Sequence, residues 1–280
     1  MGAHYKVQKV LNNNVVIATD LEKKEVVLIG KGIGFSKQAN DSLDSKKVDK
    51  LYILEDQLEQ DQYKQLLEQV EESFILVMND VIRYSEEQLQ TEFNEHIHIA
   101  LTDHLAFAIK RIQQGLDLVN PFLTETQLLY PKEYTVAEDV VKLISNKTGV
   151  ALPEGEVGFI ALHIHSAITN RSLSRLNSYS YLINQLIEMI QLSLNVAIDQ
   201  SSINYMRLVQ HLRHGIERVE RGEQVENQDK LAKVLKEEYP ICYNLAWKLM
   251  KVMQHRLGKK VSDAEAVYLT MHLQRLSSTQ

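Results

Sequence analysis

The sequence predicts a multidomain protein in which a small antiparallel all-β head is followed by two homologous all-α helical-bundle domains. Three observations lead to this fold class: short β-branched runs fill the first 54 residues, helical periodicity continues from there to the C-terminus, and one helical block occurs twice. A chain of 280 residues can hold two or three domains that each bury a core. We expect domains at 1–60, 65–170 and 178–280.

The head has the pattern of a small sheet. Runs rich in β-branched residues span 5–10, 15–19 and 25–29, and the asparagine-rich and charged segments between them suit turns. A last strand is expected at 51–54. Because a sheet this small has little core of its own, we expect one of its faces to pack against a second copy of the chain, which makes the head a homodimer.

The helical part contains an internal repeat. From about Glu55 onward, apolar residues recur three and four positions apart, as an amphipathic helix requires. The segment Glu156–His163 returns as Glu265–His272. Five positions of an earlier block return at a second constant offset: Leu101, His104, Ile109, Arg111 and Gly115 correspond to Leu208, His211, Ile216, Arg218 and Gly222. Two copies of one domain are therefore predicted, with the boundary in the polar, serine-rich stretch 169–178, which is typical of a linker.

Composition excludes several classes of protein. A net charge of −6, with 44% hydrophobic and 24% charged residues, is ordinary for a soluble protein. The single cysteine, Cys242, excludes an intramolecular disulfide framework and suits a reducing compartment. No apolar run approaches the roughly 20 residues of a membrane span, and the N-terminus lacks a signal-peptide pattern. We therefore expect a cytoplasmic protein without membrane insertion.

Charge is unevenly distributed along the chain. Residues 1–50 contain nine lysines against six acidic residues, whereas the rest of the chain is acidic. Such a basic head on an acidic body suits a domain that meets phosphate while the body stays away from it.

A glycine-lysine segment, Gly30–Phe35, follows the third predicted strand. Its glycines permit close approach of a phosphate backbone, Lys31 could contact phosphate, and Phe35 offers a ring for base stacking. The spacing matches neither a dinucleotide fingerprint nor a P-loop. On chemistry alone, a glycine-rich turn with a core phenylalanine explains the segment equally well. The asparagines at 12–14 have a similar double interpretation, as base-reading amides or as turn formers.

The repeat singles out four histidines among the ten in the chain: His104, His163, His211 and His272. Neutral imidazole is nucleophilic near physiological pH, so it can accept a phosphoryl group and release it again. Asp103 and Glu156 are candidates for orienting the rings of His104 and His163. A single histidine on an apolar helix face is more often a satisfied core residue, and duplicated cores also repeat. Metal binding is less favoured, because neither a helical His-Glu-x-x-His motif nor a cysteine pair is present.

Three segments in the right order resemble the BglG/LicT family of transcriptional antiterminators. They are Lys9–Asn14, Gly30–Phe35 and the two histidine-bearing repeats, so the resemblance covers essentially the whole chain. The stretch Asn94–His104 is similar to the glucose-type members. The resemblance implies an RNA-binding head and two phosphotransferase-system (PTS) regulation domains. It also implies a dimer that binds a hairpin in a leader mRNA and thereby prevents terminator formation. Reversible histidine phosphorylation would control this binding, and the regulated gene would encode a glucose transporter.

The resemblance also implies partners and site residues. The partners are the leader mRNA hairpin, an EIIB-type domain of a sugar transporter, possibly HPr, and a second copy of the chain; no cofactor, metal or enzymatic activity is implied. RNA-contacting positions fall on Lys9, Asn14, Gly30, Lys31, Gly32 and Phe35, and phosphorylated positions on His104, His163, His211 and His272. Many relatives have arginine at position 31, so lysine here suits a contact to phosphate only.

Two other functions stay open on the residues alone. A phosphohistidine carrier or phosphotransferase would use the repeats and would not need the basic head. A DNA-binding activator with the same regulatory domains would need a helix-turn-helix and usually an ATPase module, and the sequence has neither pattern.

Overall fold

The computed structural model describes residues 4–52, 62, 65–66, 69–223 and 228–277. The chain divides into two compact units, one formed by 1–119 with 132–170 and the other by 120–131 with 171–280. Each unit is described by itself.

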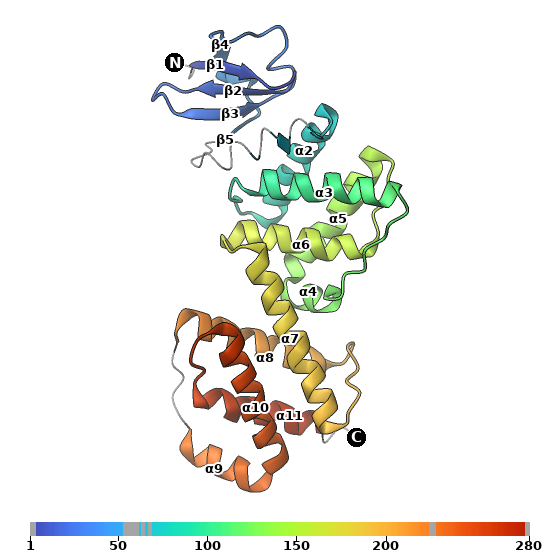
Figure 1. The fold of residues 1–280 in the computed structure, drawn as a ribbon, viewed down its shortest axis with the longest axis vertical. Helices are drawn as coiled ribbons and strands as arrows, with labels where there is room; N and C mark the ends of the chain where they lie inside the picture. Colours follow the sequence, from blue (N-terminus) through green and yellow to red (C-terminus); the bar gives the residue numbers. More distant parts are fainter. Residues whose placement is uncertain (1–3, 53–61, 63–64, 67–68, 224–227, 278–280) are drawn as a thin grey trace. The chain divides into compact units, whose positions relative to one another are not determined.

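The head is a five-stranded antiparallel sheet with the strand order β4-β1-β2-β3-β5 (Figure 1). Its strands are β1 (His4–Val10), β2 (Val15–Thr19), β3 (Glu25–Ile29), β4 (Ser42–Asp44) and β5 (Lys50–Tyr52). The three longer strands coincide with the predicted runs. The sequence did not indicate β4, and residues 53–54 of the last predicted strand lie outside the described residues.

Successive side chains of a strand point to opposite faces of the sheet. Here apolar residues occupy both faces. One face forms a core from Val7, Val16, Ala18, Val26, Leu28, Ile33 and Leu43. The other face, formed by Val15, Ile17, Val27 and Ile29, packs with Leu66, Ile75 and Ile99 of the same unit. Our expectation that a second copy of the chain covers one face is therefore wrong, because residues of the same unit cover it.

The first unit continues with helices α2 (Glu72–Leu89), α3 (Ile97–Gln113), α5 (Pro131–Thr148) and α6 (Glu154–Thr169). Helices α3 and α6 pack side by side (Figure 1). Gln90 and Asn170 adopt the left-handed conformation directly after α2 and α6, and Gly149 adopts it after α5. These residues end the helices, because a left-handed residue turns the chain out of the helical path.

The second unit contains α4 (Leu123–Leu129), α7 (Leu173–Leu194), α8 (Ile203–Arg221), α9 (Asp229–Glu238), α10 (Pro240–Leu257) and α11 (Asp263–Ser277). Helix α4 packs on α8, where the Tyr205 hydroxyl donates a 2.6 Å hydrogen bond to the buried Glu125 carboxylate. Residues 173–178, which composition assigned to a linker, form the first turns of α7.

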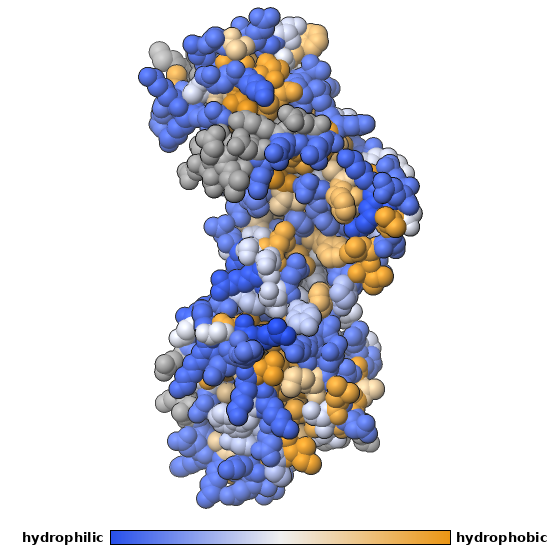
Figure 2. Space-filling model, viewed as in Figure 1, coloured by the Kyte–Doolittle hydropathy of each residue, from blue (hydrophilic) through white to orange (hydrophobic). Residues whose placement is uncertain are grey.

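The predicted repeat corresponds to matching helices in the two units. Helices α3, α5 and α6 hold the same repeated residues as α8, α10 and α11, and Pro131 and Pro240 both begin a helix. The all-β head followed by two helical repeats confirms the predicted fold class. No helix of the described part of the chain is long and apolar enough to cross a membrane. Figure 2 shows a mainly hydrophilic face with separate apolar areas.

Candidate functional site

The early and late histidines of the first repeat meet between α3 and α6. The ring centroids of His104 and His163 are 4.9 Å apart, with an interplanar angle of 37°. Phe159, one turn before His163, places its ring 5.7 Å from that of His104. Two residues far apart in the sequence are thus brought into one site.

A buried carboxylate lies beside this pair. The Glu156 side chain is 0% exposed, and its Oε2 lies 2.9 Å from His104 Nε2. Its Oε1 accepts a hydrogen bond from Arg111 Nη2. We expected Glu156 to orient the ring of His163, which follows it by about two turns, but the structure places its carboxylate against His104 of the neighbouring helix. Asp103, the other candidate, has an exposed side chain.

Charge and burial set the protonation states in this site. Burial alone would raise the pKa of Glu156, but the hydrogen bond and charge of His104 and the charge of Arg111 lower it overall. Burial lowers the pKa of His163 to about 3, with smaller contributions from the charges of His104 and His96. Glu156 is therefore ionised and His163 neutral near physiological pH.

The second repeat builds a related site between α8 and α11. The rings of His211 and His272 are 4.5 Å apart at an angle of 35°. Glu265 accepts two hydrogen bonds from Arg218, at 2.7 Å to Nε and 2.8 Å to Nη2. Its Oε2 lies 3.8 Å from His211 Nε2, which is too long for a hydrogen bond.

Both histidines of the second site are shifted toward the neutral form. Burial lowers the pKa of His211 to about 3, followed by the charges of His272, Arg218 and His214. Burial, with the charges of Arg275 and Arg207, also lowers the pKa of His272. All four predicted histidines thus lie in two pairs, one in each unit.

Sequence reasoning assigned no role to Arg111 and Arg218. Both belong to the repeated block, at corresponding positions, and both contact the repeated glutamate. The repetition of an arginine together with a glutamate and two histidines was the signal that could have identified them.

In the head, five of the six predicted RNA-contacting residues lie in or against the loop after β3: Asn14, Gly30, Lys31, Gly32 and Phe35. Asn14 Oδ1 accepts from the Gly32 amide at 2.8 Å, and the Asn14 carbonyl oxygen accepts from the Gly30 amide at 3.0 Å. Gly32 has a φ of +68°, and a Cβ at Gly30 would lie 2.1 Å from the Lys47 carbonyl oxygen. Asn14 and both glycines therefore fix the shape of this loop.

The side chains of Lys31 and Phe35 project from that loop. Phe35 is 70% exposed, so its alternative interpretation as a core residue is wrong, and its ring is available for stacking. Lys31 is exposed, and its backbone amide donates to Asp49 at 3.2 Å. Lys9 is exposed on β1, where the register with β2 shifts between Val7 and Lys9.

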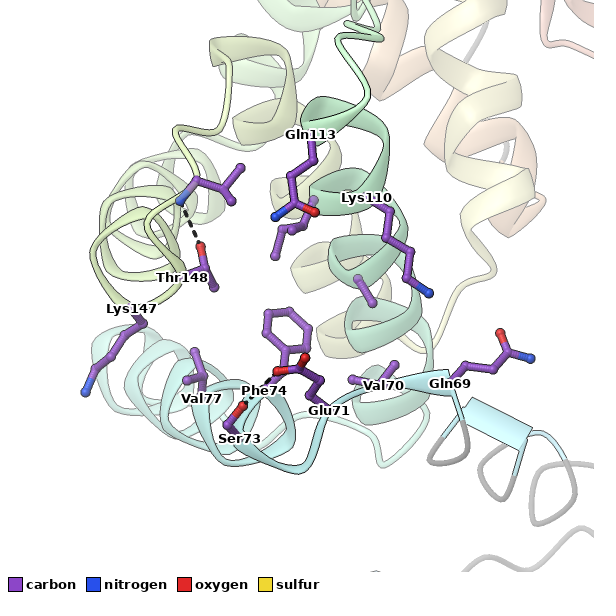
Figure 3. Close-up of a pocket in the computed structure, with 13 residues that line it drawn as sticks. Gln69, Val70, Glu71, Ser73, Phe74, Val77, Lys110, Gln113, Lys147 and Thr148 are labelled. Carbon is purple, nitrogen blue, oxygen red and sulfur yellow. Dashed lines mark hydrogen bonds between the residues drawn. The ribbon is translucent and has the colours of Figure 1, made fainter.

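A separate cavity of about 380 Å³ opens between α2, α3 and the end of α5. Figure 3 shows Phe74 directed into it. Lys110 and Lys147 line it, but none of the four paired histidines does. Within the described ranges, no group of three or more histidine, cysteine or acidic residues could hold a metal ion.

Comparisons with known proteins match the whole chain. The family model of the CAT RNA binding domain matches residues 5–61, and that of the PRD domain matches 79–167 and 184–276. The chain is 54% identical over 278 residues to the PtsGHI operon antiterminator of Bacillus subtilis (strain 168), covering 99% of each protein. It is 40% identical over 276 residues to the GlcA/glcB genes antiterminator of Staphylococcus carnosus (strain TM300), covering 97% of this chain and 95% of that one.

A solved structure is also similar. It is described as the crystal structure of GlcT CAT-PRDI and is 57% identical, with a TM-score of 0.56. The match covers 60% of this chain and 99% of the solved one.

Proposed function

Because the chain belongs to the family of antiterminators that join a CAT RNA-binding domain to two PRD domains, we propose that it controls a glucose-transport operon by binding an RNA hairpin in the leader transcript. It is an RNA-binding antiterminator of the glucose type, regulated by phosphorylation from the phosphotransferase system. Its relatives carry the names of a ptsGHI operon and of glcA/glcB genes, which supports a glucose-type target. It acts in the cytoplasm as a regulator without enzymatic activity.

The loop of Gly30–Phe35 carries the RNA-binding part of the proposal. Exposed Phe35 can stack on an unpaired base, while Lys31 and Lys9 can contact phosphates. Asn14, Gly30 and Gly32 act by shaping the loop so that a nucleic acid backbone can approach. A head of this kind favours an RNA regulator over the DNA-binding activator that the helical repeats alone leave open.

The pair of His104 and His163 carries the regulatory part, and this single observation supports the switch best. A phosphoryl group adds between about 1.5 and 2 negative charges. At His104 those charges would lie in the packed contact between α3 and α6. A charged group in this contact disfavours the packed arrangement of α3 and α6, and through it the RNA-binding homodimer. The donor is a sugar-transporter EIIB-type domain, with HPr as a further partner.

Replacing both His104 and His163 by alanine tests the switch. The double variant should give antitermination that no longer depends on the sugar, because neither position can take the inhibitory phosphoryl group. Antitermination is measured with a reporter behind the leader, with and without glucose, and phosphohistidine is mapped by mass spectrometry. The matched control is His255→Ala, since His255 is exposed on α10 outside both pairs. A double variant that still responds fully to glucose would show that these residues are not the negative switch.

A further inference from the structure

The buried pair of Glu156 and Arg111 holds two charged side chains in an environment that disfavours charge. Glu156 is 0% exposed and the Arg111 side chain 10% exposed, and burying two charges costs desolvation that their attraction often fails to offset. The pair lies directly at the ring of His104. Its placement is better explained by the chemistry of that histidine than by stability.

We propose that Glu156 and Arg111 are positioning residues for phosphoryl transfer to His104: Glu156 keeps the proton on Nε2 so that Nδ1 accepts the phosphoryl group, and Arg111 then donates to the phosphoryl oxygens. The inference rests on the proposed function, because it takes His104 to be a phosphorylation site. It adds which nitrogen reacts and which side chains direct it.

The tautomer follows from the partner of the ring. An ionised carboxylate can only accept hydrogen bonds, so the 2.9 Å contact between Glu156 and His104 places the hydrogen on Nε2. In the neutral ring the lone pair then lies on Nδ1. The carboxylate thereby selects one of the two nucleophilic nitrogens before any donor arrives.

The transfer step balances with the groups present. The Nδ1 lone pair forms a bond to phosphorus of a phosphorylated side chain on a phosphotransferase protein. The bond from phosphorus to the donor atom breaks, and its electron pair stays on the donor. The Nε2 proton remains in place, so positive charge develops on the ring, and the adjacent Glu156 carboxylate stabilises it.

Arg111 has donor capacity that the resting site does not use. One Nη2 hydrogen goes to Glu156, whereas the buried Nε has no hydrogen-bond partner among the described residues. Guanidinium groups match phosphoryl oxygens in a fork geometry. Arg111 therefore has an unused N–H group with which to bind the phosphoryl oxygens after transfer.

The second repeat provides a built-in comparison. Both oxygens of Glu265 are bound by Arg218, and the carboxylate stands 3.8 Å from His211 Nε2. The same residue types are therefore present, but the carboxylate does not hold the ring. We therefore expect phosphorylation of His211 to be less selective between Nδ1 and Nε2 than phosphorylation of His104.

The test treats the full-length protein with phosphoramidate, a small phosphoryl donor that releases ammonia and needs no partner protein. NMR coupling between phosphorus and the ring protons identifies the phosphorylated nitrogen. Wild-type protein should carry Nδ1-phosphohistidine at His104. Glu156→Gln should give a mixture of the two isomers and a rate lowered by about tenfold, since a charge-assisted hydrogen bond is lost. Arg111→Lys should retain Nδ1 but lose the phosphoryl group faster.

The matched control is Glu265→Gln in the second repeat. Its effect on the isomer ratio at His211 should be smaller than the effect of Glu156→Gln on the isomer ratio at His104. A structural defect in Glu156→Gln would slow the reaction without changing the isomer, so the isomer ratio separates the two roles. Phosphorylation of wild-type His104 at Nε2, or an unchanged isomer ratio in Glu156→Gln, would overturn this inference and leave the proposed function intact. Absence of phosphohistidine with both phosphoramidate and phosphotransferase proteins would overturn both.

Discussion

Burial decides the charge state of the paired histidines at the scale of single residues. His163 and His211 both have a pKa near 3 because the folded protein removes their rings from water. They are neutral at physiological pH, which is the form that can attack phosphorus. The same desolvation makes the folded state sensitive to acid.

The free energy of unfolding should fall as the pH drops from about 6.5 toward 3. Since the pKa of His211 is about 3 in the folded protein and 6.5 in its ordinary state, the unfolded chain binds the proton first in this interval. The stabilising contribution is complete above pH 6.5 and is lost below it, by up to about 1.4 kcal/mol per pH unit. Urea unfolding at several pH values, followed by the fluorescence of the single tryptophan, Trp247 of α10, measures it.

The variant His211→Asn should flatten this pH profile, because asparagine does not titrate. His255→Asn, at an exposed position on α10, is the control and should retain the wild-type profile. Parallel profiles for wild type and His211→Asn would contradict the assignment of a buried neutral ring to His211.

At the scale of elements, the repeated helices differ at one position that faces the second carboxylate. Gly215 lies inside α8, where the repeat places Ala108 in α3. A Cβ at Gly215 would meet Glu265 Oε2 and Met253 Cε at 3.5 Å, which is ordinary van der Waals contact. The site has room for a methyl group.

Gly215→Ala should therefore stabilise the second unit by about 0.5 to 1 kcal/mol, because alanine loses less backbone freedom in a helix than glycine does. The shift in the urea midpoint, again read from Trp247, measures the gain. Gly258→Ala should have the opposite sign, since Gly258 ends α10 with a φ of +64°. A loss of stability in Gly215→Ala would mean that the helices cannot accept the methyl group.

Elements with strong periodicity were predictable from the sequence, and short or polar ones were not. Strand β4 has only three residues, with Leu43 as its one buried side chain, which is too little for an alternating pattern. The first turns of α7 are polar where they face solvent, but Ser172 caps the helix and Leu176 is fully buried. Composition alone therefore suggested a linker.

The candidate site was predictable in its residues and not in its contacts. Repetition identified the four histidines and Glu156, since duplicated chemistry leaves a pattern in the sequence. The hydrogen bond of Glu156 to His104 depends on how α3 packs against α6, and sequence spacing within one helix carries no information about the neighbouring helix. The exposure of Phe35 likewise depends on how the glycine loop folds.

At the scale of the whole molecule, charge is separated between the head and the helical body. Lysines outnumber acidic residues in 1–50, although the chain as a whole carries a net charge of −6. RNA binding should thus depend on a few lysines of the head, while the acidic body contributes repulsion. Electrostatic and stacking contributions can be distinguished, because only the electrostatic one releases counterions from the RNA.

Affinity of the full-length protein for a hairpin from its target leader should fall steeply with salt concentration. In a plot of log affinity against log salt, Lys31→Gln should reduce the slope by about 0.7 to 0.9, the value of one phosphate contact. Phe35→Ala should weaken binding by about 1 to 3 kcal/mol at every salt concentration and leave the slope unchanged, because a stacked ring displaces no counterion. Lys230→Gln, on the exposed surface of α9, controls for a general loss of positive charge. Equal slopes for Lys31→Gln and wild type would show that Lys31 does not contact an RNA phosphate. Full affinity of Phe35→Ala would show that the exposed ring does not stack on a base.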